Sequence, residues 1–190
     1  MYFDKEIWEN DKYRLEIQQD EHPENPREWD NQTKMICFSN RYNLGDKHDY
    51  SDQGQFIEQM GLPDDSIQLY CLVAYEHGLI QLAIDDGNMG YPFSCPWDSY
   101  KIGYIYMPKN NLTIKEINTI MKQELAIYNQ YLEGEVYGYI LSKKIPLYEL
   151  VDGDYLLSKT IRYEEVGSLW GMFSKSEIFD NVAIEGLVKK

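Results

Sequence analysis

The sequence predicts an α+β fold: a mostly antiparallel sheet with about three helices, of which one is long and central and one is C-terminal. Two apolar runs, residues 67–75 and 79–84, are separated by a short turn containing Gly78, which is a β-hairpin pattern. Between residues 114 and 132 the apolar side chains instead recur at helical spacing, behind a capping box at Thr113. Strands joined by hairpins pair antiparallel, so these segments together determine the fold class.

Composition narrows the class of protein. A chain of 190 residues with 43% hydrophobic and 14% aromatic residues predicts one folded domain over residues 1–190. This domain has a charged N-terminal segment and a variable C-terminal part, residues 143–190. No apolar run approaches the roughly 20 residues that span a bilayer, and the N-terminus lacks the pattern of a signal peptide. Three cysteines, an odd number in apolar surroundings, favour a reduced protein, and we expect a cytoplasmic location in a host cell.

The first third of the chain predicts two strands, two loops and a short helix. Residues 13–18 alternate strictly and predict a half-buried strand, and residues 35–38 predict a second strand. Residues 20–30 contain two prolines and predict a loop that Trp29 pins to the body. Residues 41–50 predict an exposed loop, followed by a helix from about Asp52 to residue 60.

The middle of the chain predicts a buried sheet and an irregular loop. Both strands of the hairpin are apolar on both sides for part of their length, so we expect them at the centre of a sheet covered by helices. Residues 85–100 pass through two prolines around Cys95 and predict a rigid loop that carries Trp97 and Asp98. In the next strand, residues 101–107, Gly103 indicates a bulge or a close backbone approach.

The C-terminal third predicts three short strands and a helix. Residues 135–141 have strand character, residues 143–151 predict a connection through Pro146, and residues 155–163 and 167–173 predict two further strands. A second capping box at Ser174 starts a final helix. Its apolar side chains are Ile178, Phe179, Val182, Ile184 and Leu187.

Known catalytic and ligand motifs are absent from the sequence, so we expect no catalytic residue, no cofactor and no enzyme activity. One alternative is a thiol nucleophile at Cys95 with a base from His22, His48 or His77 and with Asp98. A buried thiol beneath Trp97 is the favoured reading, with Asp98 accepting backbone N–H groups or pairing with Arg41 to hold the loop. Asp46, His48 and Asp49 are too close together in sequence for a spaced metal site, and no metal is expected.

Charge is the most unusual property of the sequence. The chain carries 32 acidic and 18 basic side chains, a formal net charge of −14, and residues 1–100 hold 20 of the acids but only 7 of the bases. Such a surface repels nucleic-acid phosphates and attracts basic grooves that ordinarily hold them. The alternative is that the acidic excess only keeps the protein soluble.

Four motifs carry a family resemblance. Residues 25–31 (NPREWDN), 41–46 (RYNLGD), 92–99 (PFSCPWDS) and 134–139 (GEVYGY) occur in this order. Together they resemble a family of small acidic proteins encoded by phages, prophages and conjugative elements of Gram-positive bacteria. The resemblance covers most of residues 13–141 and extends weakly to Trp170. Two departures are Tyr100, where the family often has glycine, and a longer segment at residues 143–165.

The resemblance implies a mobile-element setting and therefore a role in counter-defence, with no catalytic residue to transfer. The leading hypothesis is an anti-CRISPR-like or anti-restriction-like inhibitor whose acidic surface occupies the basic groove of a host defence protein, a Cas effector being one candidate. No direct contact with nucleic acid or membrane is expected. The candidate contacts are Asp46, Asp49, Asp52, Asp64, Asp65, Asp85 and Asp86, and the structural motif residues are Trp29, Arg41, Cys95, Trp97 and Asp98.

Two alternatives belong to other functional classes. The first is a sponge or enzyme acting on a nucleotide immune signal, which would stack its base on an aromatic pocket around Tyr91, Trp97 and Tyr104. The sequence shows no basic cluster beside that pocket for the phosphates. The second is a regulatory or structural accessory protein of the phage itself.

Overall fold

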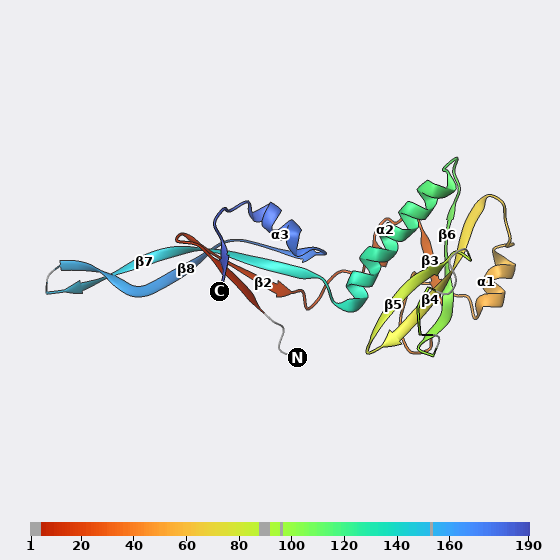
Figure 1. Ribbon diagram of the computed structural model, residues 1–190, viewed down its shortest axis with the longest axis horizontal. Coiled ribbons are helices and arrows are strands. Elements are labelled where there is room, and N and C mark those ends of the chain that lie inside the picture. The colour runs from red at the N-terminus through yellow and green to blue at the C-terminus, as the bar shows by residue number, and fades with distance from the viewer. Residues whose placement is uncertain (1–4, 88–91, 96, 153) are drawn as a thin grey trace. The chain divides into compact units, whose positions relative to one another are not determined.

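The computed structural model describes residues 5–87, 92–95, 97–152 and 154–190, and the chain in these ranges forms two compact units. Unit 1 combines residues 1–23 with residues 134–190, and unit 2 is the continuous segment 24–133 (Figure 1). The expected boundary at residue 143 therefore lies inside unit 1. The single-domain organisation over residues 1–190 stays a prediction, and each unit is described by itself.

Unit 2 contains a four-stranded antiparallel sheet in the order β3-β6-β4-β5. Its strands are β3 (Lys34–Cys37), β4 (Ile67–His77), β5 (Leu79–Asp85) and β6 (Ser99–Pro108). The predicted hairpin is confirmed, because β4 pairs with β5 from Cys71–Asp85 to His77–Leu79. Of the two hairpin strands, however, only β4 lies inside the sheet. β5 is an edge strand, and its apolar side chains are covered by a helix on one side.

Two helices cover opposite faces of this sheet. The long helix α2 (Ile114–Glu133) buries Ile117, Met121, Leu125 and Tyr128 against one face. Thr113 and Glu116 form the predicted capping box at its start. On the other face, the short helix α1 (Gln53–Gln59) buries Phe56 in a second core with side chains of β3 and β6. The unit is therefore a three-layer arrangement of helix, sheet and helix.

Strand β6 contains the irregularity that Gly103 predicts. Its register with β4 shifts between Leu72 and Val73, opposite Gly103 and Lys101. A Cβ atom built on Gly103 would lie 1.9 Å from the carbonyl oxygen of Ile36 and 2.9 Å from the Cα of Cys37. Only glycine lets the backbones of β3 and β6 approach this closely.

Unit 1 contains a five-stranded antiparallel sheet in the order β8-β7-β2-β1-β9. Its elements are β1 (Glu6–Glu9), β2 (Tyr13–Gln19), β7 (Tyr137–Val151), β8 (Asp154–Met172), α3 (Lys175–Val182) and β9 (Val188–Lys189). Leu15 and Ile17 of β2 pack with Met172 and with Ile178 of α3 in one apolar core. The fold class is thus α+β with mostly antiparallel strands and three α-helices in the described part of the chain.

The C-terminal third differs from its prediction in three places. Residues 143–151 are not a connection but the second half of β7, and the two strands expected at 155–163 and 167–173 are one strand, β8. Pro146 is tolerated because β2 pairs with β7 only as far as Lys143, so the far edge of β7 is free at Pro146. The final helix ends at Val182 because Ala183 adopts a left-handed conformation, with φ of 47°.

Beyond the end of β2, strands β7 and β8 continue as a two-stranded hairpin, which we call the arm (residues 144–163; Figure 1). Most of its large apolar side chains are solvent-exposed. They are Tyr148, Leu150, Val151, Tyr155, Leu156, Leu157, Ile161 and Tyr163. A soluble protein seldom leaves so many such side chains in water on one element.

Candidate functional site

A buried ion cluster joins two of the four sequence motifs in unit 2. Arg27 lies in the 3₁₀ turn η1 (Pro26–Glu28), and its guanidinium is 1% exposed. It donates to Asp46 at 3.0 Å, to Glu124 at 3.2 Å and to the carbonyl oxygen of Thr33 at 2.7 Å. Two carboxylates and a carbonyl thus satisfy one buried cation.

This cluster gives Asp46 an internal role. Its carboxylate also accepts the backbone N–H of Met35 at 2.7 Å, so both oxygens are engaged within unit 2. We therefore leave Asp46 out of the surface proposed below. Arg27 anchors the loop that Trp29 was expected to pin, and Trp29 itself is 42% exposed. The sequence contained a signal for this, because Arg27 is a basic residue in a turn of an otherwise acidic segment.

The motif at residues 92–99 does not build a buried thiol. Trp97 is 94% exposed and does not cover Cys95, so this expectation is wrong. Asp98 accepts a hydrogen bond from the Cys95 thiol at 3.3 Å, and its carbonyl accepts the N–H of Glu76. Arg41 pairs with Glu76 and not with Asp98. The loop is therefore tied to β4 through its backbone at Asp98, while the thiol–carboxylate contact lies within the loop itself.

The same geometry does not form a nucleophile–base–acid relay. His77 lies 3.7 Å from the Asp98 carboxylate, so Asp98 stands between the thiol and the imidazole instead of behind the imidazole. His48 faces the carbonyl of Cys37 at 2.9 Å on another part of unit 2. No group of three or more metal-ligating side chains gathers in the residues that the structure describes.

The thiols of Cys37 and Cys95 in unit 2 should react with an alkylating reagent at different rates. Burial, with Asp46 nearby, raises the pKa of Cys37 from 9.0 to about 12, so its thiol stays protonated far above neutral pH. Cys95 is half-buried in its loop. At pH 8 in the folded protein, we expect iodoacetamide to modify Cys95 and to leave Cys37 at least about 100-fold slower. Peptide mass spectrometry over time measures both rates, and equal rates would contradict this assignment.

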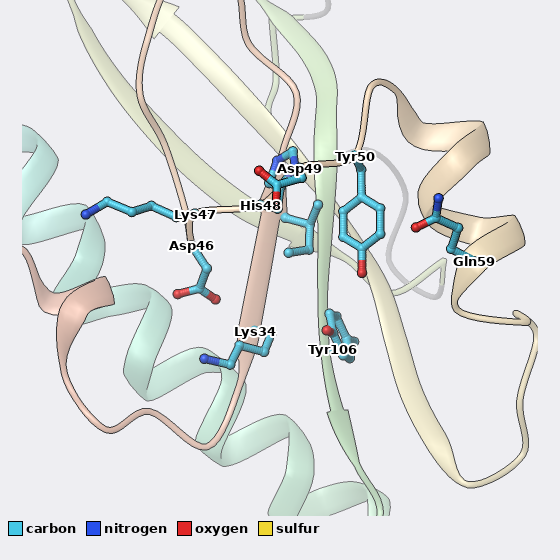
Figure 2. Close-up of a pocket in the computed structure, with 9 residues that line it drawn as sticks. Lys34, Asp46, Lys47, His48, Asp49, Tyr50, Gln59 and Tyr106 are labelled. Atoms are coloured by element: carbon cyan, nitrogen blue, oxygen red, sulfur yellow. The ribbon is translucent and has the colours of Figure 1, made fainter.

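A pocket of about 550 Å³ opens on the α1 side of unit 2. It lies between the loop at residues 46–50 and α1, over β3 and β6 (Figure 2). Its polar lining consists of Lys34, Asp46, Lys47, His48, Asp49, Tyr50, Gln59 and Tyr106. Figure 2 shows Tyr50 and Tyr106 on one side of the pocket, with the amines of Lys34 and Lys47 directed toward the other side.

The pocket offers hydrogen bonds but no convergent cationic site. Lys47 is already paired with Glu28 at 3.0 Å. Burial, together with Tyr50 and Asp46, raises the pKa of Tyr106, so its hydroxyl stays a donor. The Nδ1 atom of His48 is buried and has no hydrogen-bond partner in the described ranges. The pocket can hold a small polar ligand, but it lacks a positioned nucleophile.

The other candidate aromatic pocket does not form. Tyr104 is 8% exposed and packs in the core beneath α1, whereas Trp97 projects into solvent. The third residue of that expectation, Tyr91, lies outside the described residues. The structure therefore does not bring the rings of Trp97 and Tyr104 together.

The remaining predicted acidic contacts divide into two sets. Asp49 and Asp52 precede α1, and Asp64 and Asp65 follow it, all four exposed. The other two, Asp85 and Asp86, are half-buried at the end of the edge strand β5. The acidic contacts therefore flank two different elements, α1 and the edge strand β5.

In unit 1, the motif at residues 134–139 packs against Trp170. A Cβ atom on Gly138 would lie 2.1 Å from the ring of Trp170, so the glycine makes room for the indole.

The helices in the described part of the chain do not combine the length and hydropathy that crossing a bilayer requires. The resemblance to small acidic proteins of mobile elements stays an expectation from the sequence, since no family model, curated protein or solved structure matches the chain.

Proposed function

We propose that the chain is a non-enzymatic counter-defence protein that inhibits a host nucleic-acid-targeting complex by placing acidic side chains in its basic groove. One observation supports this most directly. Residues 48–66, which include α1 and the turns beside it, contain five acidic residues and no basic one. They are Asp49, Asp52, Glu58, Asp64 and Asp65, all exposed, and we call them the α1 acidic segment.

Local hydrogen bonds keep this segment charged. The backbone N–H of Gln55 and the hydroxyl of Ser51 bond the Asp52 carboxylate and lower its pKa. The backbone N–H and hydroxyl of Ser66 do the same for Asp64. A lowered pKa means that the carboxylate is ionised at any pH above its ordinary range. The negative charge therefore persists through mildly acidic conditions.

The surrounding unit reinforces the segment. Unit 2 carries 16 acidic and 8 basic residues, a net charge of −8. Three of its bases, Arg27, Arg41 and Lys47, are in ion pairs with carboxylates of the same unit. Charge of one sign speeds association with a basic groove and makes the affinity fall with salt.

Neutralising the segment tests the proposal. The variant combines Asp49→Asn, Asp52→Asn, Asp64→Asn and Asp65→Asn, which preserves the side-chain acceptors at the helix cap and the turn. The target is captured from host lysate at low salt and identified by mass spectrometry, and its affinity is then measured with the purified protein. We expect the variant to bind about 10–100-fold more weakly at low salt and to show a shallower salt dependence.

A matched control carries Asp152→Asn, Asp154→Asn, Glu164→Gln and Asp180→Asn, four exposed acids of unit 1. It has the same net charge as the test variant and should bind nearly as well as the wild type. If both variants lost the same amount of affinity, the effect would come from the net charge of the chain and not from the α1 acidic segment. Capture of a target without a nucleic-acid groove, or affinity indifferent to salt and to both variants, would contradict the proposal.

The pocket in Figure 2 favours one second candidate, a sponge for a nucleotide immune signal. Its volume and its hydroxyl, amide and amine groups suit a small polar ligand. Calorimetric titration with cyclic mono- and dinucleotides tests this directly. Binding that is lost in Tyr106→Phe and Lys34→Gln, yet unaffected by neutralising Asp52, Asp64 and Asp65, which do not line the pocket, would favour this candidate over the first.

A further inference from the structure

The arm of unit 1 presents one face on which the paired side chains that the structure describes carry no charge. Directly paired residues of antiparallel strands share a side, and residues two apart along a strand return to that side. The pairs Tyr148–Leu157 and Leu150–Tyr155 therefore lie on one face, and Pro146–Ile161 continues it beyond a register shift between Pro146 and Tyr148. We call these six residues the apolar arm face. The opposite face is mixed, because its pairs are Ile145–Arg162, Glu149–Leu156 and Val151–Asp154.

The apolar arm face is exposed along its length. Ile161 is 44% exposed, Tyr148 60%, Leu150 62%, Leu157 65% and Tyr155 76%. With large side chains of this kind contributing roughly 100–200 Å² each, the face leaves on the order of 600 Å² of apolar surface in water. The largest apolar patch on an ordinary monomer is about 300–600 Å² and commonly marks an interaction site.

The arm also lacks the support that strands of this length need. From residue 144 onward β7 pairs only with β8, and a two-stranded ribbon is at best marginally stable in water. A layer packed against the apolar arm face would remove its surface from water and stabilise the ribbon. Sheets packed in this way lie about 10 Å apart with interdigitated side chains.

We propose that the apolar arm face binds the same face of a second copy of this chain, so that two arms pack face to face as a small sandwich. A two-fold axis through the contact makes the interface self-complementary. A standard stable interface takes about 800 Å² from each partner, and the apolar arm face supplies on the order of 600 Å² of it. The face is therefore large enough to form most of a symmetric dimer interface.

Charge favours a second copy over a membrane or an acidic partner. The whole chain carries −14, so most surfaces of two copies repel each other, and an anionic lipid surface repels them as well. The arm is the exception: residues 143–165 carry four basic and five acidic residues, and the six paired residues of the apolar arm face include none of either. Contacts between these six side chains of two copies bring no like charges together.

The base of the arm marks where the contact ends. Lys144 donates to Glu9 at 2.9 Å, and the guanidinium of Arg14 lies 4.8 Å from the ring centre of Tyr163. These charged and aromatic groups border the face on the side of the sheet body. An uncharged centre with a charged border is the usual arrangement of a specific protein interface.

The test uses the full chain and two matched substitutions. Leu157→Glu places a charge on the apolar arm face, and Leu156→Glu places the same charge on the opposite face one residue away. Sedimentation equilibrium over a range of micromolar concentrations measures the dimer dissociation constant. We expect a dimer for the wild type and for Leu156→Glu, and dissociation at least about 100-fold easier for Leu157→Glu, because its two charges would be buried unpaired.

Thermal unfolding followed by circular dichroism shows whether both variants keep the fold. If Leu157→Glu does not fold, Tyr155→Ser replaces it as a milder substitution on the same face. A wild-type monomer at every concentration overturns the proposal. So does a dimer that both variants weaken equally, or one that Leu157→Glu leaves intact. A monomer that binds vesicles of phosphatidylcholine and phosphatidylglycerol, and loses this in Leu157→Glu, overturns it in favour of a lipid surface.

Discussion

Replacing Arg27 with methionine should lower the free energy of unfolding of unit 2 by about 3–5 kcal/mol. The substitution keeps most of the side-chain volume but removes the cation that lies between Asp46 and Glu124. Both carboxylates are largely buried, with side chains 9% and 15% exposed, and would remain without their main partner. Urea unfolding followed by circular dichroism measures the change.

Arg41→Met is the matched control for this prediction. Arg41 also pairs with a carboxylate, Glu76, but its side chain is 74% exposed. An exposed ion pair contributes at most about 1 kcal/mol, so this variant should unfold close to the wild type. Adding Asp46→Asn and Glu124→Gln to Arg27→Met should recover part of the loss, because no unpaired charge is then buried. Equal unfolding midpoints for Arg27→Met and Arg41→Met would show that the cluster does not stabilise the unit.

Gly103→Ala should destabilise unit 2 by about 3 kcal/mol, through overpacking and not through lost contacts. The new methyl group would meet the backbone of Ile36 and Cys37, at 1.9 Å and 2.9 Å from the nearest atoms. If the atoms in contact belonged to a side chain, that side chain could rotate away. Here they belong to the backbone of a paired strand, so the two strands have to separate. We expect the variant to weaken β3–β6 pairing, which hydrogen exchange of the Ile36 and Tyr104 amides would detect.

Gly167→Ala provides the control in a strand of unit 1. A Cβ atom there meets nothing within 4 Å, and the backbone does not have the positive φ that favours glycine. The exchange should be neutral or slightly stabilising, within about 1 kcal/mol, because alanine restricts the unfolded chain more than glycine does. If Gly103→Ala were as well tolerated as Gly167→Ala, the close approach of β3 and β6 would not limit stability.

Local sequence patterns determined much of the fold. The capping box at Thr113, the helix cap at Ser174 and the hairpin at Gly78 were predictable, because each depends on neighbours within a few residues. The irregularity at Gly103 was predictable from the glycine itself. The arm was not, since Pro146 inside a strand ordinarily indicates a break. Whether proline is tolerated depends on where β2 ends, and Tyr13 of β2 is 130 residues away in sequence from its partner Lys143.

The candidate sites depended even more on long-range contacts. Charge alone made Asp46 and Asp49 equivalent, yet one is bonded to Arg27 and the other is exposed. Similarly, Trp97 follows a cysteine in a proline-rich loop, and its sequence neighbours gave no sign that the ring projects into solvent. Glu58 was missed because it lies within α1, although its exposure adds to the acidity of that segment.

The order of pairing in unit 1 has a consequence for how the chain folds. Strands β2 and β7 are neighbours in the sheet, with Gln19 opposite Tyr137. Just beyond them, the N–H of Asp20 donates to the carbonyl of Val136 at 2.7 Å. Residues 24–133 are therefore an insertion between two adjacent strands. During synthesis the N-terminal strands must wait for their partner until that insert has emerged, whereas the insert is continuous and already contains every strand of its own sheet. If the insert folds first, it brings the ends of the interrupted sheet closer together and reduces the entropy lost in joining them.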